Sequence, residues 1–254
     1  MSWTAIVLAG SRPGADPFAA QHGTDLKALI PVGGVPMVGR PVRALLDSPS
    51  IAMVRVLTQQ PDRISEVLPS DSRLGVEVSG ATIAATLDDV LADPATQYPL
   101  IVTTADHALL SPSMIADFCR QADGAELAIG VVERRSLMKR LPATRRTWLR
   151  FRGGAFSGAN LFAFGSPAAA RAVALWRSVE QDRKKGWRMI AALGPVSLIG
   201  AILRLRTIDE TLDSVGKRLG LVIRKVELAD PLAAVDVDKP ADHELVTAIL
   251  EGQA

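Results

Sequence analysis

The feature that most constrains the fold is a regular alternation of short apolar runs with longer amphipathic stretches along the chain. Strand-like runs occupy residues 5–8, 53–57, 75–78, 100–103, 127–132, 159–164 and 221–226. Helix-like patterns lie between most of them, at residues 38–46, 62–68, 82–91, 111–121, 167–179 and 241–250. This alternation predicts an α/β protein with a mostly parallel sheet and helices on both of its faces.

Two of the helical stretches begin with a recognisable cap. Ser111 precedes Pro112, and Ser166 precedes Pro167. Serine is a favoured N-cap residue, and proline is tolerated at the first helical position because the amide there needs no partner. Both pairs therefore predict helix starts.

The length and composition fit one soluble globular domain. The chain has 254 residues, of which 48% are apolar and 22% are charged, so we expect a single domain over residues 1–254. The net charge is only +2, which gives no argument for bulk nucleic-acid binding. We expect no nucleic-acid partner, and any anionic ligand must be held by local basic clusters.

The cysteine content and the first residues favour the cytoplasm. Cys119 is the single cysteine, which excludes an internal disulfide and a cysteine-built metal site. We expect it to be a small buried residue on a helix. The opening MSWTAIVLAG lacks the basic region and the length of a signal peptide, so it reads as the first strand.

Unusual residues follow three of the expected strands. In sheets of this kind, ligands bind beyond the carboxyl ends of the strands, so the chemistry is expected just after Leu8, Val78 and Thr103. The segment VTTADHALL, residues 102–110, carries a lone carboxylate, Asp106, at the end of an apolar run. A carboxylate in that place suggests a ligand-binding role or the cap of a turn.

The loop after the first strand can be interpreted in two ways. GSRPG, residues 10–14, allows a tight turn whose amides face a phosphate while Arg12 supplies charge. The same glycines could form an ordinary turn. Lys27 follows a long excursion and leads into ALIPVGGVPMV, which reads as a strand, a glycine turn and a helix start. Lys27 is either a functional cation or a surface lysine.

The order of these parts resembles the nucleotidyltransferase superfamily of sugar-phosphate, methylerythritol-phosphate and molybdenum-cofactor enzymes. The resemblance lies in a strand that ends in LAG, an arginine-bearing loop, a lysine, and the phrase IPVGGVPMV. It implies a GT-A-like three-layer α/β/α fold with a mixed, mostly parallel sheet. It also implies that Arg12 and Lys27 are catalytic and hold a nucleoside triphosphate together with the backbone of the first loop, at Leu8, Ala9, Gly10 and Ser11.

The chain departs from the family pattern in this first signature. The usual Gly-x-Gly-x-Arg core is shortened to GSRPG, the loop before Lys27 is longer, and no proline directly precedes Lys27. These departures bear on the role of Arg12.

SGATIAATLDDVLA, residues 79–92, resembles the second signature of the family, in which a small-residue turn leads into a helix. The resemblance implies that Gly80, Ala81 and Thr82 lie against the nucleoside, with Thr86 one turn later. Small residues permit a flat base to approach the backbone closely. The alternative is an ordinary glycine turn with Thr82 as an N-cap.

The resemblance also implies a divalent cation. Asp106 occupies the family's metal-ligand position and is expected to contact the nucleotide's metal. AAVDVDKPADHELV, residues 233–246, resembles the closing signature, with Asp238 as the second ligand and Asp236 in reserve. Mg²⁺ prefers such oxygen ligands, and Mn²⁺ is the alternative. Asp238 could instead cap the helix that begins at Pro240, and His107 is expected to be a packing residue.

The acceptor side is expected in a subregion of about residues 133–215. The segment 133–152 has eight basic residues and one acidic residue, a density that usually marks a solvated face. Arginines there could also bind a phosphate bidentately. The candidate acceptor residues are Arg145, Arg146 and Arg150, with Lys139 as a weaker one. GGAFSGANLFAF resembles the family segment that adds Asn160 to this set.

An uncharged stretch at residues 189–203 is flanked by basic residues and interrupted by Gly194, Pro195 and Gly200. It is too short to span a bilayer. A buried hairpin or a homodimer contact is one interpretation. A peripheral contact with the inner membrane face through residues 183–206, or with a lipid-linked acceptor, is the other.

Together these segments predict a Mg²⁺-dependent nucleotidyltransferase. It would move a nucleoside monophosphate from CTP, GTP or UTP to a phosphorylated acceptor and release pyrophosphate, with CTP as the first choice because the SGAT turn resembles the cytidylyl branch. Two alternatives remain open, a catalytically silent nucleotide-binding regulatory module and a membrane-surface interaction protein.

Overall fold

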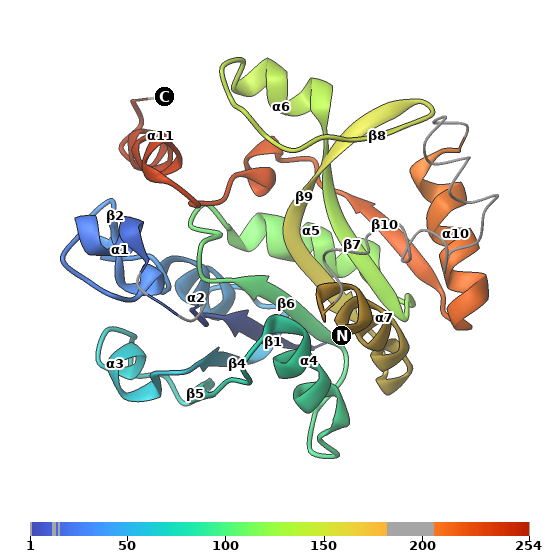
Figure 1. Cartoon of the computed structure of the whole chain (residues 1–254), viewed down its shortest axis with the longest axis horizontal. Helices are drawn as coiled ribbons and strands as arrows, with labels where there is room; N and C mark the ends of the chain where they lie inside the picture. Colours follow the sequence, from blue (N-terminus) through green and yellow to red (C-terminus); the bar gives the residue numbers. More distant parts are fainter. Residues whose placement is uncertain (1, 12–13, 15, 182–205, 254) are drawn as a thin grey trace.

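The computed structural model describes residues 2–11, 14, 16–181 and 206–253. The fold is built around a central eight-stranded sheet (Figure 1). Its strands are β1 (Trp3–Leu8), β4 (Ile51–Thr58), β5 (Leu74–Val78), β6 (Leu100–Thr104), β7 (Leu127–Glu133), β8 (Leu149–Phe151), β9 (Gly154–Phe164) and β10 (Ile223–Glu227). The order is β10-β7-β9-β6-β1-β4-β5, with β8 paired to β9. Strand β9 runs antiparallel to β6, β7 and β8, and the other pairs are parallel. The predicted mixed, mostly parallel sheet is confirmed.

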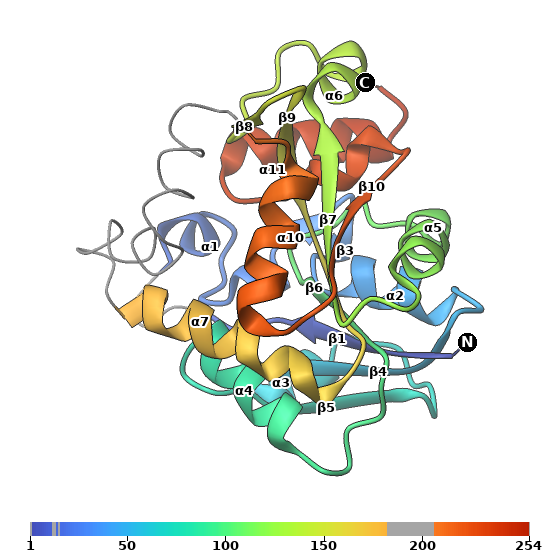
Figure 2. The same ribbon diagram turned by 90° about the vertical axis from the view of Figure 1, so that its right-hand side faces the viewer.

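Helices cover both faces of the sheet, as predicted. Figure 2 shows α4 (Ile83–Ala92), α7 (Ala170–Gln181) and α10 (Ile208–Leu219) on one side of the sheet, with α2 (Gly39–Leu46) and α5 (Pro112–Ala122) on the other. Shorter or peripheral elements are α1 (Pro17–Gln21), α3 (Pro61–Ser65), α6 (Arg134–Arg140), α11 (Pro240–Leu250), the 3-10 turns η1 (Lys27–Leu29), η2 (Pro167–Ala169) and η4 (Pro231–Ala234), and the hairpin of β2 (Pro31–Val32) and β3 (Val35–Pro36).

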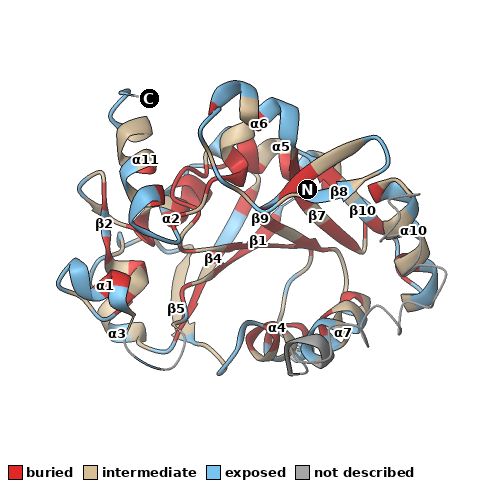
Figure 3. Ribbon diagram, turned by 45° about the horizontal axis from the view of Figure 1, so that its top comes forward, coloured by how far each residue is buried: buried red, intermediate tan, exposed pale blue. Residues whose placement is uncertain are grey.

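Strand β1 explains why both faces need a helical layer. Ala5 and Val7 belong to the core cluster on the α2 and α5 side, whereas Ile6 between them belongs to the cluster with α4 and α7. Successive side chains of a strand point to opposite faces, so a strand with a run of consecutive apolar residues must be covered on both faces. Figure 3 shows the buried residues concentrated along the sheet. Cys119 is buried on α5, as predicted.

The predicted helix starts have mixed outcomes. The Oγ of Ser111 accepts a hydrogen bond from the amide of Met114, so Ser111 caps α5. Pro167 begins a 3-10 turn rather than the predicted α-helix, and Ser166 makes no side-chain cap bond there. Ser166 and Pro167 therefore do mark a helix start, since the 3-10 turn is followed directly by α7, but the serine side chain does not cap it.

Some elements were not predicted from the sequence. These are α1, α6, α10 and β8, and β9 begins at Gly154 rather than at residue 159. Helix α10 carries a detectable signal, since Thr207 and Glu210 form a capping box and Gly220 ends the helix in the left-handed conformation.

In the described part of the chain, no helix is long and apolar enough to cross a bilayer. The stretch at residues 189–203 lies outside the described residues.

Gly165, which follows β9, gives a stability prediction. A Cβ at this position would lie 2.1 Å from the carbonyl oxygen of Ala125, so the backbone would have to move. We expect Gly165→Ala to lower the free energy of unfolding by about 3 kcal/mol, the upper range for overpacking. Urea unfolding measures this, with Gly158→Ala in β9 as the matched control.

The control lacks the steric clash. A Cβ at Gly158 would meet nothing within 4 Å, so Gly158→Ala should change stability by no more than about 0.5 kcal/mol. Equal unfolding midpoints for the two variants would contradict the packing argument.

Candidate active site

The centre of the site is Lys27, whose ammonium group joins two carboxylates far apart in the sequence. Its Nζ donates to Oδ2 of Asp106 at 2.8 Å and to Oδ1 of Asp238 at 2.7 Å. Burial alone would lower the pKa of Lys27, but the two carboxylates outweigh burial and raise this pKa. The fold thus brings a carboxylate from the end of β6 and a carboxylate from the segment before α11 to one ammonium group, that of Lys27 in η1.

Contacts from Thr104 and Val237 fix the position of Asp106. The Oγ1 of Thr104 donates to Oδ1 of Asp106 at 2.5 Å, so both oxygens of Asp106 have partners. The amide of Val237 donates to the carbonyl of Asp106 at 3.0 Å, which ties the closing segment to the end of β6. Lys239, not Asp238, occupies the N-cap position of α11. The carboxylate of Asp238 is therefore available to Lys27.

The reserve candidate Asp236 has different partners. Its Oδ1 accepts from Arg146 Nη1, and its Oδ2 accepts from Asn160 Nδ2 at 3.0 Å. Burial raises the pKa of Asp236, while Arg146 opposes that rise. Among the described residues, no three His, Cys, Asp or Glu side chains form a group able to hold a metal ion. The two carboxylates that meet at Lys27 are those of Asp106 and Asp238, whereas the carboxylate of Asp236 faces Arg146 and Asn160.

Gln59, directly after β4, joins the first loop to the turn after β5 and was not predicted from the sequence. Its Oε1 accepts from the amide of Ser11 at 2.8 Å, and its Nε2 donates to the carbonyl of Gly80 at 3.3 Å. A Cβ at Gly10 would lie 2.9 Å from Nε2 of Gln59, so a glycine there allows the loop to pass close. Gln59 could have been found by extending the rule of strand carboxyl ends to the strand ending at Thr58.

Backbone groups of the segment predicted to hold the triphosphate already have protein partners. The amide of Ala9 donates to the carbonyl of Leu57, and the carbonyl of Leu8 accepts from Ala105. These bonds extend the sheet past the end of β1. The amide of Ser11 could meet a phosphate only after the Gln59 side chain moved. Arg12 lies outside the described residues.

The turn between β5 and α4 has the predicted helix start. Thr82 caps α4, with Oγ1 accepting from the amide of Ala85, and Ala81 beside it is exposed. Thr86 is buried, and its hydroxyl donates to the carbonyl of Thr82. A Cβ at Gly80 would lie 3.0 Å from the amide of Thr86, so glycine lets the turn pack on the helix.

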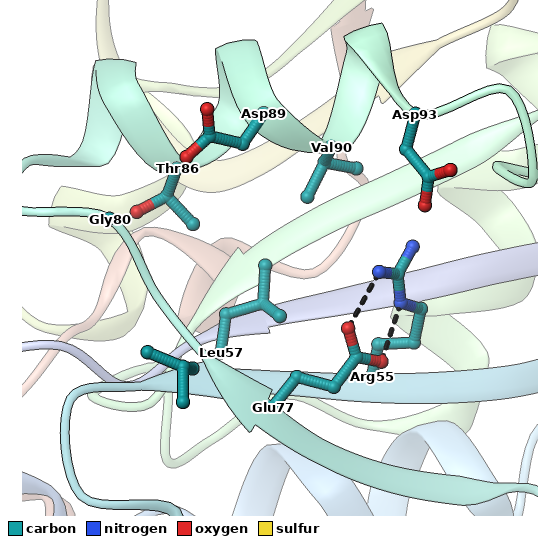
Figure 4. A pocket seen from close by; sticks show the side chains of 9 residues that line it. Arg55, Leu57, Glu77, Gly80, Thr86, Asp89, Val90 and Asp93 are labelled. Carbon is teal, nitrogen blue, oxygen red and sulfur yellow. Dashed lines mark hydrogen bonds and ion pairs between the residues drawn. The ribbon is translucent and has the colours of Figure 1, made fainter.

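A cavity of about 210 Å³ lies under this turn, between α4 and strands β4 and β5. Figure 4 shows Arg55 and Glu77 paired on the sheet side and Thr86 on α4. The cavity includes two predicted nucleoside residues, Gly80 and Thr86, but none of the Lys27 cluster lines it. The cavity lies behind the turn and is separate from the carboxylates of Asp106 and Asp238.

The predicted acceptor residues differ in their surroundings. Lys139 on α6, Arg145 in the following loop and Arg150 on β8 are exposed. Helix α6 packs against η4, which precedes the segment carrying Asp238. Arg146 instead contacts Asp236, and Asn160 lies inside β9 rather than before a strand.

His107, next to Asp106, is a packing residue. It is fully buried, and its Nδ1 lies 3.2 Å from Oγ1 of Thr103. Burial lowers the pKa of His107 to about 4, against the opposing charge of Asp106. The imidazole is therefore neutral near pH 7.

Comparisons with known proteins identify structures of similar fold. A hypothetical transferase from Thermus thermophilus has 26% identity and a TM-score of 0.80 over 96% of this chain and 100% of its own. The 2-C-methyl-D-erythritol 4-phosphate cytidylyltransferase of the same organism has 17% identity and a TM-score of 0.52, covering 99% and 100%. CMP:2-keto-3-deoxy-manno-octonic acid synthetase complexed with CTP has 14% identity and a TM-score of 0.61, covering 100% of both chains. No curated protein matches the sequence.

The family model for the MobA-like NTP transferase domain matches residues 5–219. This span includes the first loop, Lys27, the β5–α4 turn and Asp106. The chain therefore belongs to the MobA-like NTP transferase family and is a nucleotidyltransferase.

Proposed function

We propose that the protein transfers a nucleoside monophosphate, CMP in the first instance, from a triphosphate to a phosphorylated acceptor, with release of pyrophosphate and dependence on Mg²⁺. The observation that carries this proposal is the convergence of Asp106 and Asp238 on one cation, Lys27 Nζ, at 2.8 and 2.7 Å. The site adjoins the first loop, where the family resemblance expects the triphosphate.

The donor set fits a divalent cation. Mg²⁺ commonly takes one or two carboxylates and completes its shell with substrate phosphates and water. Asp106, Asp236, Asp238 and Asp242 outnumber Lys27 and Arg146 as charged groups of one contact network. Asp106 and Asp238 would hold the ion, and its charge would stabilise the charge that develops on the phosphates.

The chain's own residues supply orientation and charge. An oxygen of the acceptor phosphate forms a bond to the α-phosphorus while the bond between that phosphorus and the pyrophosphate oxygen breaks. Lys27 would stabilise the negative charge on the departing pyrophosphate, and Lys139, Arg145 and Arg150 would bind the acceptor. The reaction is one of positioning and electrostatics, since a phosphate acceptor is already anionic and needs no general base.

CTP is the first choice of nucleotide for two reasons. The SGAT turn resembles the cytidylyl branch, and two structural neighbours have names that include cytidylyltransferase or CTP. The sequence suggests that residues 183–206 could contact a lipid-linked acceptor, a membrane surface or a second copy of the chain. Most of this segment lies outside the described residues.

A thermal-unfolding panel tests the nucleotide. With Mg²⁺ present, we expect CTP to raise the melting temperature more than GTP, UTP or ATP, because a ligand that binds only the folded state stabilises it by mass action. At one hundred times Kd the gain is about 2.7 kcal/mol, or roughly 5–10 °C for a chain of this size. EDTA should remove most of the shift.

Pyrophosphate release separates the enzyme from the alternatives. The protein with Mg²⁺, the selected nucleotide and a panel of phosphorylated sugars, polyols and lipid-linked phosphates should release pyrophosphate with at least one acceptor. Tight nucleotide binding with no release under any pairing would favour a silent binding module. Liposome binding that needs neither nucleotide nor Asp106 would favour a membrane-surface protein.

A further inference from the structure

Arg146, one of the predicted acceptor residues, makes its contacts inward. It lies in the loop between α6 and β8, and its side chain is only 9% exposed, whereas Arg145 beside it is exposed. Its Nη1 donates to Oδ1 of Asp236, and its Nη2 donates to the carbonyl of Asp236 at 3.1 Å. The same Nη2 lies 3.6 Å from Oδ1 of Asp242. The guanidinium thus contacts both ends of the segment 236–242.

Asn160 holds the other oxygen of the Asp236 carboxylate. The pairing of β7 with β9 is irregular here, since it steps from Ile129–Phe162 to Val131–Gly158. Asn160 lies in this bulge with a φ of 47°, a left-handed conformation that asparagine tolerates better than most residues. The bulge redirects its side chain, and Nδ2 donates to Oδ2 of Asp236 at 3.0 Å. Both carboxylate oxygens of Asp236 are therefore fixed from outside the segment.

These contacts determine where Asp238 lies. The carboxylate of Asp238 is 63% exposed, so packing around the side chain itself does little to orient it. Its amide donates to Oδ2 of Asp242 at 3.3 Å, and Arg146 contacts the other oxygen of Asp242. The neighbouring amide of Val237 bonds to the carbonyl of Asp106. Arg146 therefore holds the residues on either side of Asp238.

The charge of Arg146 also stabilises this arrangement within the fold. Its guanidinium pairs with the carboxylate of Asp236, whose side chain is 22% exposed, and also lies 3.6 Å from the carboxylate of Asp242. Arg146 is thus a counter-charge shared by two carboxylates of this segment. A planar guanidinium can supply it and bind a carboxylate and a carbonyl together, which a lysine cannot do in the same geometry.

We propose that Arg146, assisted by Asn160, is a positioning residue that fixes the segment 236–242 so that Asp238 faces Asp106 across the cation site. The inference rests on the proposed function, because it assigns Asp238 to the metal. It also removes Arg146 from the predicted acceptor set and leaves Arg145 and Arg150 in it. Supporting groups of this kind commonly change metal affinity by about 10- to 100-fold.

The test measures Mn²⁺ binding to the whole protein by electron paramagnetic resonance, without nucleotide. Arg146→Lys retains the positive charge but removes the planar guanidinium that donates to Asp236 through two nitrogens. A change in Mn²⁺ affinity would therefore report geometry rather than net charge. We expect Mn²⁺ to bind about tenfold more weakly to this variant. The concentration of Mg²⁺ that gives half-maximal turnover should rise by a similar factor.

Two further variants make the result specific. Arg145→Lys makes the same change at the neighbouring exposed residue and should leave Mn²⁺ affinity as in the unmodified protein. Asn160→Gly removes the amide while accepting the left-handed backbone, so it guards against misfolding of Arg146→Lys and should weaken Mn²⁺ binding in the same direction.

The outcomes separate this inference from the proposed function. Equal Mn²⁺ affinity in Arg146→Lys, Asn160→Gly and the unmodified protein would overturn the positioning role and leave the proposed function intact. An unmodified protein that binds no Mn²⁺ even with CTP would overturn the proposed metal site, and the positioning role with it. Weaker binding in both variants, with Arg145→Lys unchanged, supports the inference.

Discussion

Asp106→Asn is expected to reduce the rate of pyrophosphate release by about a thousandfold while the protein stays folded. The carboxylate contacts Lys27 through Oδ2 and Thr104 through Oδ1, and an amide of the same shape can keep only part of this arrangement. A metal ion contributes several kcal/mol to transition-state stabilisation, and each 1.4 kcal/mol is about tenfold in rate. The rate should be measured at saturating nucleotide and acceptor over a range of Mg²⁺ concentrations.

Asp117→Asn is the matched control for this result. Asp117 on α5 has a side chain about as exposed as that of Asp106, and it pairs with the surface residue Arg120. We expect this variant to retain the unmodified rate. If Asp106→Asn kept more than about a tenth of the rate, the metal-ligand role of Asp106 would have to be abandoned.

The layers of the fold could be predicted from the sequence because they follow from the period of apolar residues. Strand β1 shows this well, since consecutive apolar residues require cover on both faces and Ile6 and Val7 do pack into different clusters. Helix α10 was missed although the sequence carries a capping box at Thr207 and Glu210. The bulge at Asn160 could not be predicted, since it depends on the register between β7 and β9.

The site could be predicted only as far as the chain order of its parts. Asp106 and Asp238 are 132 positions apart, and the family resemblance alone is enough to pair them. The partners of their neighbours depend on tertiary contacts. Arg145 and Arg146 are adjacent arginines in the same basic segment, so the sequence cannot distinguish their roles. In the folded chain Arg146 contacts Asp236 and Arg145 is exposed. Gln59 was missed because an uncharged residue after a strand carries little signal by itself.

Lys27→Met is expected to change catalysis and metal binding in opposite directions. Turnover should fall by about a hundredfold or more, because the variant lacks a fixed cation beside the phosphates. Mg²⁺ without nucleotide should nevertheless stabilise the variant more than the unmodified protein. Lys27 Nζ lies between Asp106 and Asp238, so an entering metal ion must displace it, and methionine offers no such competition.

The measurement is the rise in melting temperature with Mg²⁺, compared with Lys225→Met as a matched control. Lys225 also lies between two carboxylates, those of Asp209 and Glu227, at 3.6 and 3.1 Å. Lys27→Met without metal should melt below the unmodified protein, because two carboxylates lose their counter-charge. Mg²⁺ should restore it with an apparent affinity at least about tenfold tighter, a difference of about 1.4 kcal/mol. Adding Asp238→Asn to Lys27→Met should abolish this gain. A Mg²⁺ response no larger than that of Lys225→Met would mean that Lys27 does not occupy the cation site, because removing any lysine from a carboxylate pair would then have the same effect.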